Sequence, residues 1–87
     1  MSDLDLLYAE LADDAYNRSI DESLDRVRRA VAVLAAKSLS AEQNEKLNQI
    51  RTFEKQAEQA RPQDLVAAAQ LAHRADVLAQ DLLQRVP

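Results

Sequence analysis

The sequence contains no glycine and no cysteine, and its 87 residues include only two prolines. Tight hairpins between β-strands depend on glycine at positive φ, so a chain without glycine has largely lost that route to a sheet. The absence of cysteine excludes disulfides and thiolate zinc sites, and the absence of glycine excludes a glycine-rich phosphate loop. These absences predict an all-α protein whose helices are joined by short polar turns.

Aromatic residues and long apolar runs are also scarce. Only Tyr8, Tyr16 and Phe53 are aromatic, so aliphatic residues must form most of the core. No apolar run approaches the ~18–20 residues needed to span a bilayer. The first residues are acidic where a secretory signal peptide would be basic. We therefore expect a cytoplasmic protein with no membrane partner, unless an export signal has been removed.

Charge is distributed unevenly along the chain, whose formal net charge is −4. Residues 1–25 contain eight acidic residues and one basic residue, Arg18, which gives a net charge of −7. Residues 26–37 carry four basic residues and no acidic one. The acidic stretch is either a solvated helix face or a surface for a basic partner. The basic cluster is short and lacks accompanying aromatic residues, which disfavours a nucleic-acid partner.

Apolar residues recur at helical spacing in four segments, about 3–17, 20–37, 41–60 and 63–85. Together they predict a small antiparallel bundle of about four helices that forms a single domain over residues 1–87. The stripe of the first segment consists of Leu4, Leu7, Tyr8, Leu11 and Ala15. The last segment is the most apolar, and the breadth of its apolar surface indicates a central helix that is contacted from two sides.

Serine capping boxes mark two of the predicted helix starts. Ser19 stands three residues before Glu22, and Ser40 stands three residues before Gln43. Pro62 fits the first turn of the last helix. No glycine or proline precedes Ser19, so its capping box is the only ground for separating the first two helices. A single bent helix is the alternative.

The last two predicted helices, about residues 41–84, have small residues where they would cross. The residues that carry this pattern are Asp64, Leu65, Ala68, Ala72 and Ala75. The pattern resembles a tetratricopeptide-type helical hairpin, as in short helical domains of uncharacterised bacterial proteins. Gln63 replaces the glycine that usually precedes the aspartate, and Ala72 replaces the aromatic residue of the second helix. The resemblance implies protein binding rather than catalysis.

No arrangement of residues typical of an enzyme or a metal site occurs in the sequence. His73 is the only histidine, and no Glu-x-x-His pair of the di-iron type accompanies it. Two of the serines are explained as helix caps, and a serine triad would need His73 as its base. We therefore predict a protein that is not an enzyme and that holds no cofactor or metal.

Three arginines, Arg26, Arg28 and Arg29, form the basic cluster. They can bind a phosphate or an acidic partner, or they can form ion pairs with acids of the first helix such as Asp13 and Asp14. We favour the internal ion pairs, which would guide helix register more than they would stabilise the fold.

Two functions from different classes are compatible with these features. The first is a non-catalytic protein-interaction module that forms a homodimer through apolar helix faces, because the chain has more apolar helix surface than one thin core requires. The interface residues that we expect are Leu4, Leu7, Tyr8, Leu11, Leu71, Leu78 and Leu82, the last three being shared with the core. The alternative is an acidic inhibitor or neutraliser of a basic partner protein, such as an antitoxin, an immunity protein or a nucleic-acid mimic.

Overall fold

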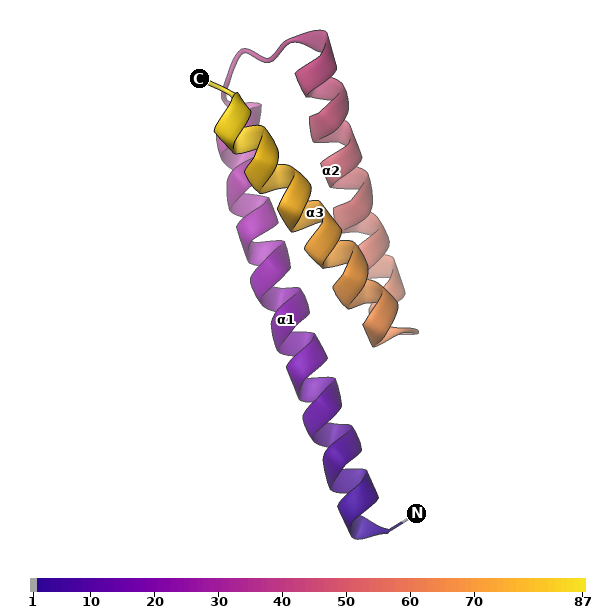
Figure 1. The fold of residues 1–87 in the computed structure, drawn as a ribbon. Helices are drawn as coiled ribbons and strands as arrows, with labels where there is room; N and C mark the ends of the chain where they lie inside the picture. Colours follow the sequence, from indigo (N-terminus) through magenta and orange to yellow (C-terminus); the bar gives the residue numbers. More distant parts are fainter. Residues whose placement is uncertain (1) are drawn as a thin grey trace.

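The computed structural model describes residues 2–87, which form three α-helices and no strand. The helices are α1 (Asp3–Ala35), α2 (Ala41–Ala60) and α3 (Leu65–Arg85). Figure 1 shows that α1 extends far beyond the other two helices at its N-terminal end. The all-α prediction is confirmed. Within the described residues, no helix combines the length and the apolar character that crossing a membrane requires.

The prediction of about four helices is wrong at one place, because the segments predicted as 3–17 and 20–37 form the single helix α1. A serine cap stabilises a helix start only where the chain before it leaves the helical conformation. No glycine or proline interrupts the chain before Ser19, so the backbone continues through it as a helix interior. The N-cap of α1 is Ser2, whose hydroxyl accepts a hydrogen bond from the backbone N–H of Asp5 at 3.2 Å.

The other two helices begin at side-chain caps. Ser40 caps α2 in the predicted capping box, accepting from the N–H of Gln43 at 3.1 Å while its own N–H donates to the Gln43 side chain at 2.9 Å. α3 begins slightly later than predicted, at Leu65, because Asp64 is its N-cap and accepts from the N–H of Ala67 at 3.0 Å. Pro62 therefore lies in the turn before α3 and not within the helix.

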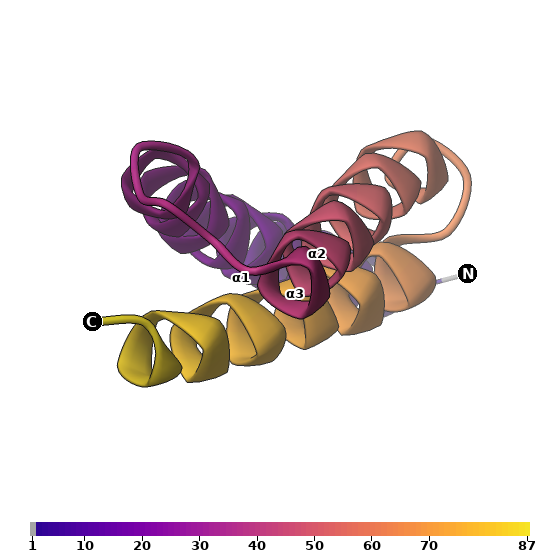
Figure 2. The ribbon, with the colours of Figure 1, turned by 90° about the horizontal axis from the view of Figure 1, so that it is seen from above.

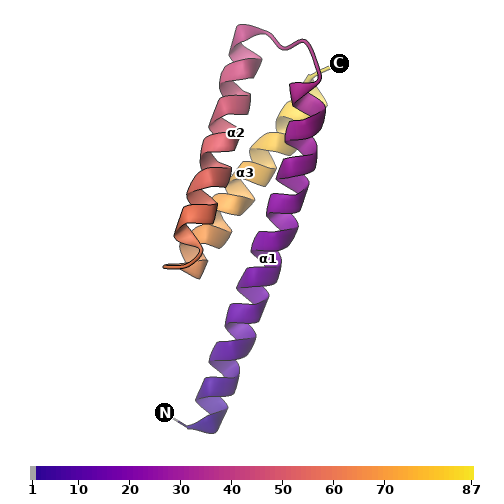
Figure 3. The same ribbon diagram turned by 180° about the vertical axis from the view of Figure 1, so that it is seen from behind.

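The three helices form two layers. α1 and α2 diverge from each other in one layer, and α3 lies across both of them in the other (Figures 2 and 3). Four alanines of α3 are fully buried in the core: Ala68, Ala72, Ala75 and Ala79. Their short side chains allow α3 to approach both neighbours closely, as the breadth of its apolar surface predicted.

The core consists of two groups of buried side chains, and all three helices contribute to each. The group near the C-terminal end of α1 contains Val27, Ala30, Leu34, Leu47, Ile50, Ala75, Ala79 and Leu82. The other contains Ile20, Leu24, Ala57, Ala68 and Ala72. Ile20 is the first buried residue of α1, so the bundle uses only the second half of that helix. We call residues 3–19 the arm; it is roughly 25 Å long at the rise of an α-helix.

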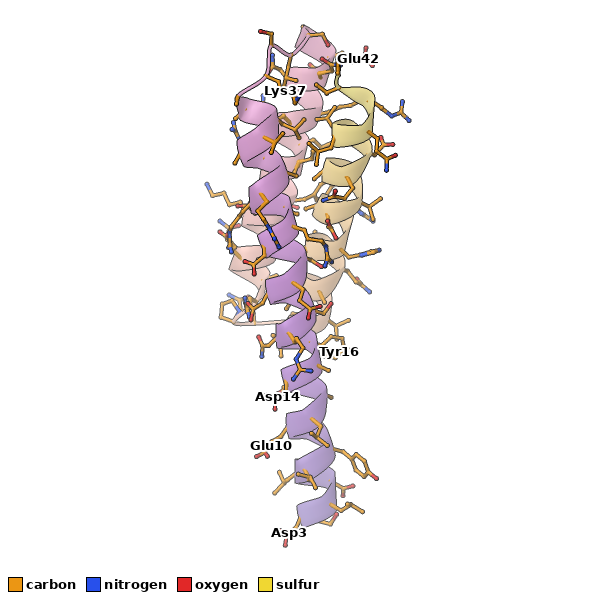
Figure 4. All side chains as sticks on the ribbon, turned by 90° about the vertical axis from the view of Figure 1, so that its left-hand side faces the viewer. Asp3, Glu10, Asp14, Tyr16, Lys37 and Glu42 are labelled. Carbon is orange, nitrogen blue, oxygen red and sulfur yellow. The ribbon has the colours of Figure 1, made fainter. Side chains whose placement is uncertain are left out.

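Two arginines of the basic cluster pair with the other two helices, and Arg29 donates to the backbone carbonyl of Asp25 within α1; none pairs with Asp13 or Asp14. The Arg26 Nε lies 2.8 Å from the Asp76 Oδ2 of α3, and the Arg28 Nη2 lies 3.0 Å from the Glu58 Oε1 of α2. The predicted pairing required the chain to fold back near Ser19. Since α1 is one continuous helix, Asp13 and Asp14 lie on the arm, more than ten residues before the cluster. Figure 4 shows Asp14 on the projecting part of α1.

Candidate interaction site

The arm carries an apolar stripe formed by Leu4, Leu7, Tyr8 and Leu11. The exposed fractions of these side chains are 58%, 52%, 64% and 56%. Single exposed apolar residues are common on protein surfaces, but four of them adjacent on one helix form a patch of the kind that marks an interaction site. The structure thus leaves accessible four of the residues that we expected at an interface.

The apolar stripe points away from the bundle. Successive residues of an α-helix are about 100° apart, which places the centre of the stripe roughly 150° round α1 from the line of Ile20, Val27 and Leu34 that faces the core. Because the two lines lie on nearly opposite sides of one helix, a partner can cover the stripe without displacing α2 or α3. Leu6 and Tyr16 are also exposed on the arm, on the side of α1 that faces the bundle further along the helix.

Acidic side chains line one edge of the arm beside the stripe. Asp3, Glu10 and Asp14 are separated by seven and four residues, a spacing that keeps them on one side of a continuous helix. Figure 4 shows Glu10 and Asp14 on the same side of the arm and Tyr16 on the other. We call these three residues the acidic edge. The arm as a whole contains five acidic residues against Arg18, a net charge of −4.

Arg61 connects the bundle to the base of the arm. Its Nη2 lies 2.7 Å from the Asp21 Oδ1, and its Nε donates to the Asn17 Oδ1 at 3.1 Å. Both partners lie on α1, where the arm leaves the bundle, while Arg61 lies in the turn between α2 and α3. No local pattern in the sequence indicates this contact, because it forms only when residues 17–21 are part of one continuous helix.

The remaining three expected interface residues lie on α3 and are separate from the stripe. Leu82 is 2% exposed and belongs to the core, so it offers no surface to a partner. Leu71 and Leu78 are half-buried and pack against the two core groups. The structure therefore brings together Leu4, Leu7, Tyr8 and Leu11 but does not join them to the α3 residues.

The described residues contain no cluster of three or more histidine, cysteine or acidic side chains arranged to hold a metal ion. His73 is exposed on the outer side of α3. Burial raises the pKa of the Glu54 carboxyl group on α2, and the charge of Glu58 raises it further, while Arg28 and Arg51 partly offset the rise.

No protein-family model, curated protein or solved structure matches this chain. The resemblance of residues 41–84 to a tetratricopeptide-type hairpin therefore stays a prediction.

Proposed function

We propose that this protein is a non-catalytic interaction module that forms a homodimer through the apolar stripe of its arm. One observation carries the proposal: four large apolar side chains, each more than half exposed, lie together on a projecting helix and face away from the bundle. The cysteine-free, acidic composition supports a cytoplasmic location and disfavours nucleic acid as the partner.

The arm is suited to docking because its helix is already formed. An isolated helix of this length is marginal in water, since the first turn is costly to nucleate. Here the bundled half of α1 supplies the nucleus, so docking requires little additional ordering of the backbone. Removing the exposed part of each stripe residue from water contributes about 1 kcal/mol per side chain, and a homodimer buries the stripe twice.

Light scattering over a range of concentrations tests the proposal directly. We expect the molar mass of a dimer for the natural sequence and that of a monomer for the Leu7→Asp, Leu11→Asp double variant. A matched control is Val33→Asp with Val77→Asp, which alters two similarly exposed apolar residues of the bundle and should leave the dimer intact. A monomer at every concentration for the natural sequence would refute self-association, and a dimer that survives the arm substitutions would exclude the stripe.

The acidic edge supports a second function, the neutralisation of a basic partner protein. Asp3, Glu10 and Asp14 flank the stripe along one side, so a basic amphipathic helix that docks there contacts apolar and acidic groups together. A suitable probe is a synthetic amphipathic helix with leucines on one face and lysines on the opposite face. Binding that weakens steeply with added salt and is lost when the three acids are changed to Asn and Gln would favour this function. Binding indifferent to salt would count against it.

A further inference from the structure

We propose that the two arms of the homodimer pair antiparallel, with Leu4 of one copy against Ala15 of the other and Tyr8 against Leu11. This inference rests on the proposed function and specifies how the stripe is used. The arm residues Leu4, Tyr8, Leu11 and Ala15 follow one another at intervals of four, three and four. That alternation is the spacing of the seam in a two-stranded coiled coil. We call these four residues the seam.

An antiparallel pairing makes the seam complementary to itself. The two-fold axis of this pair passes between Tyr8 and Leu11. It places the large Leu4 at one end of the seam opposite the small Ala15 of the second copy. The two bulkier central positions then face each other on either side of the axis. A two-fold symmetric interface requires this kind of self-complementarity.

The charges beyond the seam favour the antiparallel orientation. The next two positions of the same spacing are Arg18 and Glu22, both exposed. In a parallel pair, Arg18 would face Arg18 and Glu22 would face Glu22, which places like charges opposite each other. In the antiparallel pair, Arg18 lies beside the first turn of the second copy, which carries Asp3 and Asp5. Arg18 forms no ion pair within residues 2–87, so its guanidinium is available for that contact.

The shape of one copy allows this arrangement. The stripe faces away from the side of α1 that packs on the core, so the second arm does not meet α2 or α3. The two bundles therefore lie at opposite ends of the paired arms. One copy is 56 Å long, so two copies that overlap over the arm form a particle about 85 Å long. A parallel pair would place the bundles side by side and keep the length near that of one copy.

An interface of paired arms alone is at the small end of specific interfaces, and we expect a micromolar dissociation constant.

Disulfide crosslinking measures the orientation cleanly, because the natural chain has no cysteine. Two full-length single-cysteine variants, Leu4→Cys and Ala15→Cys, are mixed and oxidised with glutathione disulfide. A disulfide needs Cα atoms about 4.4–6.8 Å apart, so the antiparallel pair predicts a 4–15 crosslink in the mixture and little 4–4 or 15–15 crosslink in either variant alone. A Val33→Cys variant serves as the control for random collision, because Val33 is exposed on the bundle.

Small-angle scattering of the natural sequence supplies a measurement that involves no substitution. A 4–15 crosslink together with a long particle supports the antiparallel arms. Crosslinks of each variant with itself, or a dimer of nearly the length of one copy, would overturn the orientation while leaving self-association in place. A monomer in light scattering would overturn both the orientation and the proposed homodimer.

Discussion

The Nε of Arg26 donates to the Oδ2 of Asp76 at 2.8 Å, and the carboxylate that accepts this bond is the most buried acid in the ion pairs of residues 2–87. The other oxygen of Asp76 accepts from the Nε2 of Gln80 at 3.2 Å. One side chain of α3 thus satisfies a donor on α1 and a donor on its own helix. The pair joins the two helices at the place where the alanines of α3 bring them close together.

Removing this carboxylate should weaken the bundle. Asp76→Ala leaves the half-exposed Arg26 without its partner, and hydrogen bonds to charged groups contribute about 1.5–3 kcal/mol. We expect the free energy of unfolding in urea to fall by about 2 kcal/mol. The matched control is Asp81→Ala on the same helix, whose exposed pair with Arg85 should change stability by less than about 1 kcal/mol. Equal effects of the two variants would contradict the buried role of Asp76.

Enlarging an alanine of α3 should push the layers apart. Ala72 is fully buried, and a leucine there adds methylene groups to a site with no room for them. We expect Ala72→Leu to lower the free energy of unfolding by about 1–3 kcal/mol. Ala32→Leu on the exposed side of α1 makes the same chemical change without crowding and should be close to neutral. Thermal unfolding followed by circular dichroism compares the two, and a neutral Ala72→Leu would refute close packing at this alanine.

The raised pKa of Glu54 predicts a pH-dependent gain from its replacement. The Glu54 carboxyl group keeps its proton to higher pH in the folded protein than in the unfolded chain. The stability that this protonation contributes is therefore fully present below the ordinary pKa of glutamate and is lost as pH rises through the raised pKa. Glu54→Gln removes that loss. We expect the variant to have a higher Tm than the natural sequence at about pH 7 and a smaller advantage at about pH 4.

The control for this effect is Glu45→Gln, which neutralises an exposed glutamate on the same helix. Its Tm difference from the natural sequence should vary less with pH than that of Glu54→Gln. An advantage of Glu54→Gln that grows toward low pH would reverse the expected sign and contradict the assignment.

Salt should strengthen self-association of the arms. Each arm carries a net charge of −4, so pairing two of them brings like charges together around an apolar seam. Raising the ionic strength from about 0.01 M to about 0.15 M shortens the Debye length from about 30 Å to about 8 Å and screens this repulsion. Sedimentation equilibrium should show a tighter dimer at the higher salt concentration. A basic partner would give the opposite dependence, so the sign of the salt effect separates the two proposed functions.

The sequence predicted most of the fold because its local signals were strong. The absence of glycine indicated an all-α chain, and Ser40 and Gln43 marked the start of α2. Pro62 indicated a break between α2 and α3, although it lies in the turn and not in the first turn of the helix as predicted. The continuity of α1 could not be predicted in the same way. Between Leu11 and Ile20 the apolar stripe changes sides, and a change of this kind results either from a turn or from a straight helix whose two halves face different surroundings.

The candidate site was predicted only in part, because its spacing is local but its exposure depends on long-range packing. Leu4, Leu7, Tyr8 and Leu11 stood out as one stripe, but their spacing alone could not show that no helix of the bundle covers them. The contacts of Arg61 with Asn17 and Asp21 depend on where two distant segments meet, and no local pattern encodes that meeting. The pairing of Arg26 with Asp76 was missed because it connects positions fifty residues apart.

The bundled half of α1 maintains the helical structure of the arm, and this has a consequence for how the protein opens. Backbone amides near Ile20 belong to turns that pack on the core, whereas those near Leu4 lie in the first turn, where no preceding turn supplies carbonyl acceptors and the Ser2 cap is the local partner. Opening free energies should therefore decline steadily from the base of the arm to its tip, as they do toward fraying helix ends. Hydrogen exchange would show protection that decreases along one unbroken helix from its base to its tip. A partner that binds the tip would raise the protection there and reduce this difference.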